Sequence, residues 1–332
     1  MSGLFVQKHV EAVRAQGVDV RVIFSQGWRD LLAQWRSLRR EWGLPDVVQL
    51  NVIQKQGALA LWLKRRYGIP YVIIEHWSGY LPESGMYMHQ SATKRRFAER
   101  VCANAETVLS VSDMLQQAMK RCGLTAKRWG RIHNVVDDFF YQPSTINRQP
   151  SDRRTLLHVS CFDEKAKNIK ALLHAAKIYA HHHTGWQLVL IGTGIDFAEI
   201  HDYADALGLL QNGIVQFTGE LTPQQVAEWM RKADALVLTS RYETYGVVLA
   251  EAAAAGLPIL STPVGIAEEI ITDSTGIIVS QENANRAKRL SEYMNRILTM
   301  HKYTEQAQDF RAESVGKELK TVYQEIIAQS QQ

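Results

Sequence analysis

The arrangement of hydrophobic and polar residues from Thr155 onward predicts strands and helices that alternate along the chain. Short runs rich in Val, Ile and Leu, without strict alternation, are typical of strands buried on both faces of a sheet. These runs lie at residues 155–160, 187–192, 214–219, 235–240, 258–262 and 276–280. Amphipathic stretches such as 169–179 and 223–233 separate them. Helices in these places imply right-handed crossovers and therefore a parallel, doubly wound sheet.

The first half of the chain repeats this pattern less regularly. Its strand candidates are residues 18–24, 46–51, 70–76 and 107–112. Residues 142–154 carry two prolines and few apolar side chains, which is typical of an interdomain linker. We expect an α/β protein with two Rossmann-like domains whose parallel sheets face a central cleft. The expected domains are 1–145 and 146–305, and a C-terminal helix at 306–332 is the candidate to cross back to the first domain.

The composition is that of a globular protein. Hydrophobic residues make up 46% and charged residues 22% of the 332-residue chain, which is ordinary for this class. No apolar run approaches the ~18 residues of a membrane-spanning helix, and the N-terminus lacks the apolar core of a signal peptide. Cys102, Cys122 and Cys161 form no metal-binding or redox spacing, which favours a reducing compartment. We therefore expect a cytoplasmic protein.

Positive charge is concentrated in the first half of the chain. Residues 1–145 contain 20 lysines and arginines against 12 acidic residues, whereas the remainder contains 18 against 22. This asymmetry indicates an anionic partner for the first half. The helical stretch 28–42 mixes tryptophan with arginine, as helices on anionic membrane surfaces do, and 94–100 is a second basic run. The residues expected to contact the inner face of the plasma membrane are Trp28, Arg29, Trp35, Arg36, Arg39 and Arg40. The alternative is a core-packing helix with a solvated basic face.

The segment S-R-Y-E-T-Y-G-V-V-L-A-E, residues 240–251, sets two carboxylates in an otherwise apolar run. It predicts the end of a strand, a turn and the start of a helix. Gly246 allows backbone N–H groups of the first helical turn to face a ligand, and a helix N-terminus favours a phosphate. Glu243 and Glu251 can accept paired hydrogen bonds from sugar hydroxyl groups. The pattern predicts a sugar-nucleotide site, and the alternative for Glu251 is a solvated helix residue.

The run I-G-T-G-I-D, residues 191–196, places a G-x-G turn after a predicted strand. The sixth position of a dinucleotide-binding motif is Phe197 here instead of glycine, so the run is weak evidence for a nicotinamide cofactor. The favoured interpretation is a tight turn, containing Gly192, that lines the cleft.

The stretch E-T-Y-G-V-V-L-A-E (243–251) resembles the E-x7-E signature of the retaining glycosyltransferases of family 4, also called group 1, which have the GT-B fold. Four further segments follow the order of that family: V-L-S-V-S-D (108–113), I-H-N-V-V-D (132–137), H-V-S…K-N-I (158–169) and F-T-G-E-L (217–221). The resemblance implies that Glu251 binds the ribose and that Glu243 binds the donor sugar. The donor-binding residues that it implies are Gly192, Leu221, Tyr245, Gly246, Val247, Val248 and Glu251.

The family places an arginine and a lysine against the pyrophosphate. Lys167 matches the lysine and is the expected catalytic cation, whereas Cys161 occupies the position of the arginine. Lys165 is the candidate substitute, although an ammonium group cannot make the bidentate contact of a guanidinium. The alternative for both lysines is a solvated position at a helix start.

The resemblance also assigns residues in the first domain. His76 matches the family's histidine beside the reacting sugar, and we expect Glu75, Trp77 or Tyr80 to contact the acceptor. Relatives begin with a strand that leads into a Gly-rich loop near the substrates. This chain opens within the counterpart of that loop, with Gly3 at its end as a donor-binding residue, so the usual first strand is expected to be missing. The explanations are a truncated start or a sheet without that strand.

The resemblance implies a retaining hexosyltransferase with His76, Lys167 and Glu243 as catalytic residues. It would move a hexose from a UDP- or GDP-sugar to a glycan or lipid-linked acceptor in cell-surface polysaccharide synthesis. No metal, cofactor or nucleic acid is expected. One alternative is a non-catalytic sugar-nucleotide-binding paralogue or partner subunit, because of Cys161 and the missing strand. Another is a sugar-nucleotide epimerase, against which the E-x7-E context argues.

Overall fold

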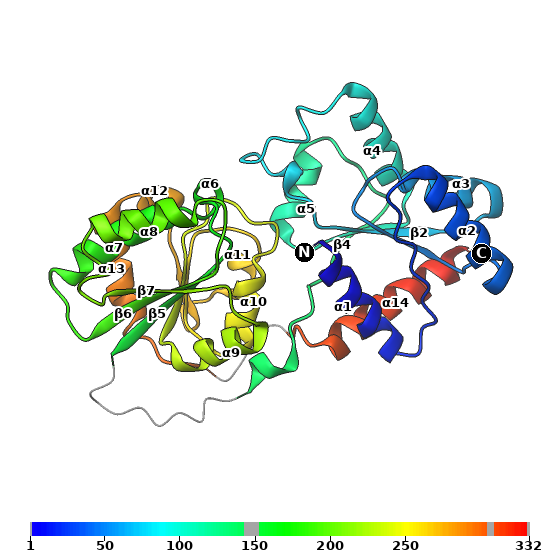
Figure 1. Cartoon of the computed structure of the whole chain (residues 1–332). Coiled ribbons are helices and arrows are strands. Elements are labelled where there is room, and N and C mark those ends of the chain that lie inside the picture. Colours follow the sequence, from blue (N-terminus) through cyan, green and yellow to red (C-terminus); the bar gives the residue numbers. More distant parts are fainter. Residues whose placement is uncertain (1, 143–152, 304–308, 331–332) are drawn as a thin grey trace. The chain divides into compact units, whose positions relative to one another are not determined.

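The computed structural model describes residues 2–142, 153–303 and 309–330 (Figure 1). Contacts divide the chain into two compact units, Met1–Val135 with Phe310–Gln332, and Val136–Asp309. The predicted linker and the boundaries expected at 145 and 305 fall mostly outside the described residues. None of the helices in the described part combines the length and the apolar character that crossing a bilayer requires.

The N-terminal unit is built on a four-stranded parallel sheet in the order β1-β2-β3-β4. The strands are β1 (Val48–Asn51), β2 (Tyr71–Glu75), β3 (Thr107–Ser110) and β4 (Trp129–Arg131). The helices are α1 (Ser2–Ala15), α2 (Trp28–Trp42), α3 (Gly57–Tyr67), α4 (Ala92–Asn104), α5 (Asp113–Arg121) and α14 (Ala312–Ser330), with the 3-10 turn η1 (Ser78–Tyr80). The first three strands confirm the predictions at 46–51, 70–76 and 107–112. The sequence pattern does not reveal β4, because W-G-R lacks an apolar run and is a strand only through its pairing with β3.

Two predictions for the N-terminal unit are wrong. Residues 18–24 form neither helix nor strand, and Val22 and Phe24 are 50% and 76% exposed. Alternating apolar residues do not make a strand unless backbone N–H and C=O groups find a partner, and no described strand pairs with this segment. Gly3, expected in a loop, lies in helix α1 with open space where a Cβ would be. The described part of this sheet contains no strand before β1.

Helices α1 and α14 come from opposite ends of the chain and pack side by side (Figure 1). Gly316 of α14 allows this close approach, since a Cβ there would lie 2.4 Å from the carbonyl oxygen of Ala12 in α1. Lys320 Nζ also donates a hydrogen bond of 2.8 Å to the carbonyl oxygen of Gln16. The position of α1 therefore depends on a segment about 300 residues away in sequence.

The C-terminal unit has a six-stranded parallel sheet in the order β10-β9-β8-β5-β6-β7. The strands are β5 (Arg154–Val159), β6 (Trp186–Ile191), β7 (Val215–Gly219), β8 (Ala235–Leu238), β9 (Ile259–Ser261) and β10 (Gly276–Ile278). The helices are α6 (Glu164–Lys167), α7 (Ile169–Ala180), α8 (Phe197–Ala206), α9 (Pro223–Lys232), α10 (Val247–Ala254), α11 (Ala267–Ile270), α12 (Gln281–Ala284) and α13 (Ala287–Ile297), with the 3-10 turn η2 (Asp138–Tyr141). These elements confirm the doubly wound parallel sheet expected for the second half.

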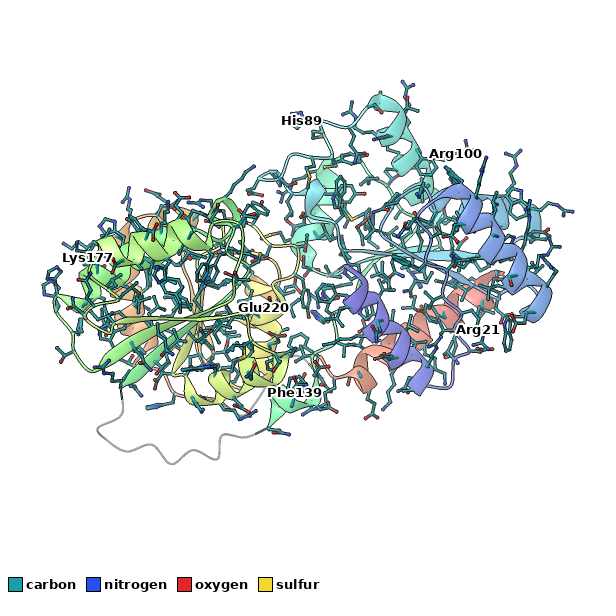
Figure 2. All side chains as sticks on the ribbon, viewed as in Figure 1. Arg21, His89, Arg100, Phe139, Lys177 and Glu220 are labelled. Carbon is teal, nitrogen blue, oxygen red and sulfur yellow. The ribbon has the colours of Figure 1, made fainter. Side chains whose placement is uncertain are left out.

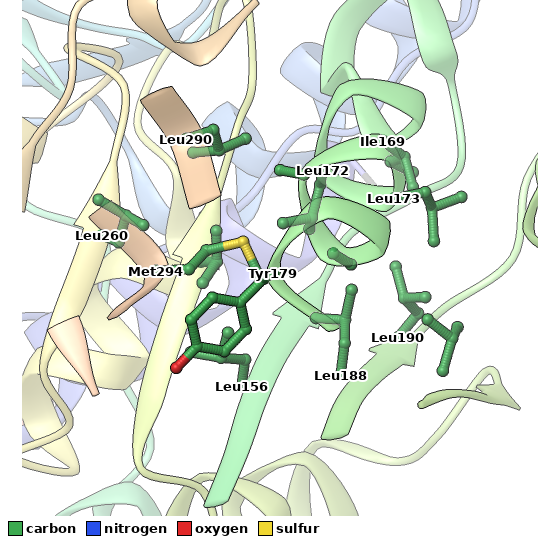
Figure 3. Close-up of a cluster of buried hydrophobic side chains, with 14 of the residues drawn as sticks. Leu156, Ile169, Leu172, Leu173, Tyr179, Leu188, Leu190, Leu260, Leu290 and Met294 are labelled. Carbon is green, nitrogen blue, oxygen red and sulfur yellow. The ribbon is translucent and has the colours of Figure 1, made fainter. Parts of the chain in front are cut away.

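The core of this unit lies between the sheet and the helices on its two faces. In Figure 1, α7, α8 and α13 cover one face and α9, α10 and α11 lie on the other. Figure 3 shows side chains of β5, β6, α7 and α13 that pack together in the first of these layers. All strands are parallel, so the residues that follow β5, β6 and β8 meet at one edge of the sheet.

Candidate active site

The turn after β8 and the short helix α6 after β5 bring two predicted residues into contact. Lys167 Nζ donates a hydrogen bond of 2.5 Å to Glu243 Oε1, and the two side chains are only 13% and 16% exposed. Ser240 Oγ donates to the same oxygen at 2.9 Å. A charged pair at this depth is stable only when its remaining polar atoms have partners, so the hydroxyl of Ser240 supports the arrangement. The structure therefore places an ammonium and a carboxylate side by side at the edge of the sheet.

The environment of Lys167 keeps it protonated. Burial works against the charged form, but the Glu243 carboxylate and the hydrogen bond to it outweigh burial, and the net effect raises the pKa of Lys167. An ammonium group has three N–H donors, and the contact with Glu243 uses one of them. Lys167 is therefore protonated at neutral pH and has further N–H donors for an anionic ligand.

Arg241 holds helix α6 against the turn, and sequence reasoning overlooked it. Its guanidinium donates to the carbonyl oxygens of Glu164 and Lys165 and to the side-chain oxygen of Asn168. Its own backbone N–H donates to the carbonyl oxygen of Ala166 at 2.7 Å. Cationic groups at a helix C-terminus are favourable because the last carbonyl groups have no helical partner. The hint in the sequence is S-R-Y-E, where Arg241 lies in the turn after the buried strand β8.

The turn also leads into helix α10, whose N-cap is Gly246 with φ of 76°. This left-handed backbone suits glycine, and a Cβ there would lie 2.9 Å from the side chain of Leu249. Val247 and Val248 are the first residues of α10, so their N–H groups have no acceptor inside the helix. Glu251 lies one turn further along α10 and is half-buried. Along the chain after β8, Glu243 comes first. The N–H groups at the start of α10, which have no acceptor inside the helix, follow it, and Glu251 comes next.

Tyr245 and the loop after β9 fix this helix start from the other side. Tyr245 is buried, and its carbonyl oxygen accepts a hydrogen bond of 2.9 Å from the N–H of Ile266. Gly265 has φ of 55°, and a Cβ on it would lie 2.1 Å from that carbonyl oxygen. The N-terminus of α10 is therefore held rigidly by backbone packing, as a binding site for a charged group requires.

The G-T-G turn after β6 packs against the chain itself. A Cβ on Gly192 would lie 1.9 Å from the carbonyl oxygen of Ser160, and one on Gly194 would lie 2.4 Å from that of Phe162. The N–H of Phe162 also donates to the carbonyl oxygen of Thr193 at 2.8 Å. The glycines are thus explained by close backbone contact with the segment after β5. Leu221, which follows β7, is partly exposed near the start of α9.

The two residues that flank the expected pyrophosphate position are both accessible. Lys165 in α6 is exposed, and Cys161 in the preceding turn is exposed with a free thiol. Asp163 begins α6, where its side chain accepts a hydrogen bond from the N–H of Ala166. The structure thus places Lys165 and Lys167 on the same short helix, two residues apart.

In the N-terminal unit, a buried carboxylate shapes the turn that carries His76. Glu75 Oε1 accepts hydrogen bonds of 2.9 Å from the N–H groups of both His76 and Trp77, and its Oε2 accepts one of 3.0 Å from the N–H of Ile53. Burial raises the pKa of Glu75 to about 7, although these N–H groups and the hydroxyl of Tyr80 favour the carboxylate. Glu75 therefore positions the turn from inside the protein.

His76 is partly exposed, and its Nε2 is buried without a hydrogen-bond partner among the described residues. Burial, together with the neighbouring ring of His9, lowers the pKa of His76 to about 3. The imidazole is therefore neutral at pH 7 and carries one N–H donor and one acceptor. Trp77 and Tyr80 pack edge to face with ring centroids 5.0 Å apart, and Tyr80 is buried.

Comparisons with known proteins agree with this architecture. Residues 144–314 match the family model described as glycosyl transferases group 1, and residues 5–138 match the model described as glycosyltransferase family 4. The Vi polysaccharide biosynthesis protein VipC/TviE of Salmonella typhi is 32% identical over 135 residues, which are 40% of this chain and 23% of that protein. Alpha-monoglucosyldiacylglycerol synthase of Streptococcus pneumoniae is 24% identical over 321 residues, which are 90% of this chain and 72% of that protein.

A solved structure with a similar fold is that of HepE from Anabaena in complex with UDP and glucose. The TM-score is 0.68 and the sequence identity is 21%, and the match covers 95% of this chain and 89% of that one. At this identity the similarity concerns the fold.

Proposed function

The chain belongs to the group 1 glycosyl transferases and has their two-domain GT-B fold, and from this premise we propose that it is a retaining hexosyltransferase. The proposed donor is a UDP- or GDP-sugar, and the proposed acceptor is a glycan or lipid-linked saccharide of a cell-surface polysaccharide. The Salmonella relative is a polysaccharide biosynthesis protein and the Streptococcus relative a glycolipid synthase, which supports this acceptor class. The UDP and glucose bound to the Anabaena protein support the donor class.

The contact between Lys167 and Glu243 beside the start of α10 carries this proposal. A nucleoside diphosphate needs positive charge and N–H donors at its phosphates, and hydroxyl-binding carboxylates at its sugars. Lys167 and the N–H groups of Val247 and Val248 supply the first, and Glu251 and Glu243 the second. In this proposal Glu251 binds the ribose and Glu243 binds the hexose.

The proposed reaction is a substitution on one face of the donor sugar. The bond between the anomeric carbon and the diphosphate breaks, and a bond from an acceptor oxygen to the same carbon forms. The proton of the acceptor hydroxyl passes to the departing phosphate oxygen. Lys167 and the first turn of α10 stabilise the charge that develops on the diphosphate, which is the main electrostatic task in such a reaction. Lys165 would supply charge in place of the family's arginine, whose own position is occupied by Cys161.

Release of nucleoside diphosphate from UDP-, GDP- and ADP-sugars, with and without a lipid-linked saccharide, tests the activity. Lys167→Ala should lower kcat by about 100-fold, because one preorganised donor to the developing charge is lost. Glu251→Ala should weaken UDP binding by about tenfold, because a charged hydrogen-bond acceptor is lost. Lys177→Ala on α7 (Figure 2) removes a lysine outside the site and serves as the matched control.

Equal effects of Lys167→Ala and Lys177→Ala would contradict the catalytic assignment of Lys167. Unchanged UDP affinity in Glu251→Ala would remove its role at the ribose. UDP binding without turnover on any donor and acceptor pair would favour a non-catalytic sugar-nucleotide-binding protein, which the exposed Cys161 in place of an arginine already suggests.

We also propose that helix α2 contacts an anionic membrane surface, which would bring a lipid-linked acceptor close. Trp28, Leu32 and Trp42 of α2 are 49%, 40% and 53% exposed. The arginines at 29, 36, 39 and 40 are exposed on the same helix. Exposed tryptophan beside arginine suits the boundary between lipid headgroups and acyl chains.

A further inference from the structure

Helix α12 follows the edge strand β10 and reaches the turn after β8, although β9 lies between these two strands in the sheet. Gln281, the first residue of α12, donates through Nε2 to the carbonyl oxygens of Ser240 and Arg241, at 2.9 and 3.2 Å. Its Oε1 is buried and has no hydrogen-bond partner among the described residues, so the two donor contacts hold this amide group. Ser240 in turn donates to Glu243, so Gln281 supports the segment that carries the carboxylate.

At the other end of α12, Asn285 contacts the residue that follows Lys167. The Oδ1 atom of Asn285 accepts a hydrogen bond of 3.0 Å from Nδ2 of Asn168. Asn168 is only 2% exposed, and its own Oδ1 accepts from the guanidinium group of Arg241. A guanidinium group only donates, so both ends of the Asn168 amide are determined. The side chain of Asn168 is therefore held between the turn after β8 and helix α12.

The backbone of Asn168 depends on these contacts. Its φ of 55° and ψ of 42° are left-handed, a conformation that asparagine adopts more readily than most residues. This conformation ends α6 directly after Lys167. Thr239 Oγ1 also donates to the carbonyl oxygens of Lys167 and Asn168, at 3.1 and 3.2 Å. A residue in a sparsely populated conformation persists where its surroundings determine it. The contacts of Asn168 therefore determine how the last residue of α6 is oriented.

We propose that Gln281 and Asn285 are positioning residues of the transferase reaction, which act through the contact between Lys167 and Glu243. The two residues are four positions apart, so one face of α12 presents both side chains. Gln281 holds the turn of the carboxylate, and Asn285 holds the residue beside the ammonium group. Neither of them lies in the segments 158–169 or 240–251. The proposal rests on the proposed function for the reaction that the pair serves.

Substitution of Asn285 tests this role. Leucine fills a similar volume without an acceptor, so the buried Nδ2 of Asn168 loses its partner and water has little room to replace it. We expect Asn285→Leu to lower kcat for UDP-glucose, followed as UDP release, by about tenfold, because a small displacement of a catalytic group is costly. The affinity for UDP should change much less. Asn285→Asp keeps an acceptor for Asn168 and should recover most of kcat.

A second variant and a control come from the same helix. Gln281→Met has a similar length and no donor, so it should also lower kcat by about tenfold. Asn283→Leu is the matched control, since the described contact of Asn283 is that of its backbone N–H with Ser280. Equal losses of kcat in Asn283→Leu and Asn285→Leu would contradict the proposal.

A double substitution separates positioning from general stability. If Asn285 acts through Lys167, adding Asn285→Leu to Lys167→Ala should cause no further loss of kcat, because the group that it positions is already absent. If the effect of Asn285 is only structural, the losses of the two single variants will multiply in the double variant. That result would overturn the proposal.

Nitrogen NMR of the lysine side chains in the full chain tests the same contact without turnover. Lys167→Ala identifies the signal of the Lys167 ammonium group. Asn285→Leu should move this signal toward the signals of exposed lysines, whereas Asn285→Asp should leave it near its wild-type position. An unchanged signal in Asn285→Leu would overturn the proposal. If the wild-type chain does not release UDP from UDP-glucose, the proposed function fails on this donor, and the lysine signal still decides whether Asn285 positions Lys167.

Discussion

At the scale of single residues, the structure gives the buried carboxylate of Glu75 a task that its position after a strand does not reveal. It is fully buried, and it accepts three backbone hydrogen bonds from two segments of the N-terminal unit. In a sequence, a glutamate at a strand end looks like a ligand-binding group. The structure shows instead that its oxygen atoms are occupied by N–H groups of the turn that carries His76.

The raised pKa of Glu75 predicts a specific pH dependence of stability. The folded protein binds its proton up to about pH 7, whereas the unfolded chain releases it near the ordinary value of 4.5. Stability from this group is therefore present at low pH and is lost as pH rises through 7, by up to about 3 kcal/mol. Glu75→Gln cannot ionise, so it should lose less stability than the wild type between pH 5 and pH 8.

Urea unfolding of both proteins at pH 5 and pH 8 measures this difference. At low pH the glutamine variant should be the less stable one, because its amide group cannot accept the N–H of Ile53 as a carboxyl oxygen does. Parallel pH profiles for the two proteins would show that Glu75 is not the titrating group.

At the scale of elements, helix α2 shows how an amphipathic pattern leaves its partner undecided. The predicted helix at 28–42 is confirmed as Trp28–Trp42. Trp35, expected on the membrane-facing side, is buried with Leu63 and Ile69, so its assignment as a membrane contact is wrong. The apolar residues of α2 cover more than one side of the helix. One side packs on the core, and the other remains exposed.

The exposed side of α2 predicts binding to anionic vesicles. A variant with Arg36→Gln and Arg39→Gln should bind vesicles that contain phosphatidylglycerol about 30-fold more weakly than the wild type, at about 1 kcal/mol per charge. A control variant with Arg289→Gln and Arg296→Gln removes the same charge from exposed positions of α13 in the other unit. Equal losses in the two variants, or equal binding to neutral phosphatidylcholine vesicles, would argue against a specific role of α2.

At the scale of the whole molecule, the N-terminal unit is completed by the end of the chain. Helix α14 follows the C-terminal unit in sequence but packs against α1 of the N-terminal unit. Because α1 carries Phe5 and His9, the contact at Gly316 also determines how these rings lie against His76. A residue more than 200 positions from His76 thus supports the turn at the end of β2.

Gly316→Ala tests this long-range contact. Glycine to alanine inside a helix ordinarily stabilises a protein by up to about 1 kcal/mol. Here the added methyl group would meet the backbone of Ala12, so we expect a loss of about 1–3 kcal/mol in unfolding free energy. Gly3→Ala in α1 is the matched control, since open space surrounds that position and no loss is expected. A stabilised Gly316→Ala protein would show that α1 and α14 pack less closely than described.

The sequence by itself determined the strands of both sheets where apolar runs are long, the helix start at Gly246 and the candidate donor residues around it. These features are local, since burial and backbone preference are encoded by the spacing of neighbouring residues. The short motif around Glu243 and Glu251 was recognisable because its residues are close together in sequence.

Only the tertiary structure decided which of these residues meet. It showed that no described strand pairs with residues 18–24, that Gly3 lies in a helix, and that Trp35 belongs to the core. It also showed that Arg241 holds the helix of Lys167 and that the ring of His9 lies beside that of His76. Each of these depends on partners distant in sequence, because backbone pairing, ion pairs and buried hydrogen bonds form only where the fold brings the second group. The residue pattern indicates which interactions a side chain can form. The packing of the whole chain determines with which partner it forms them.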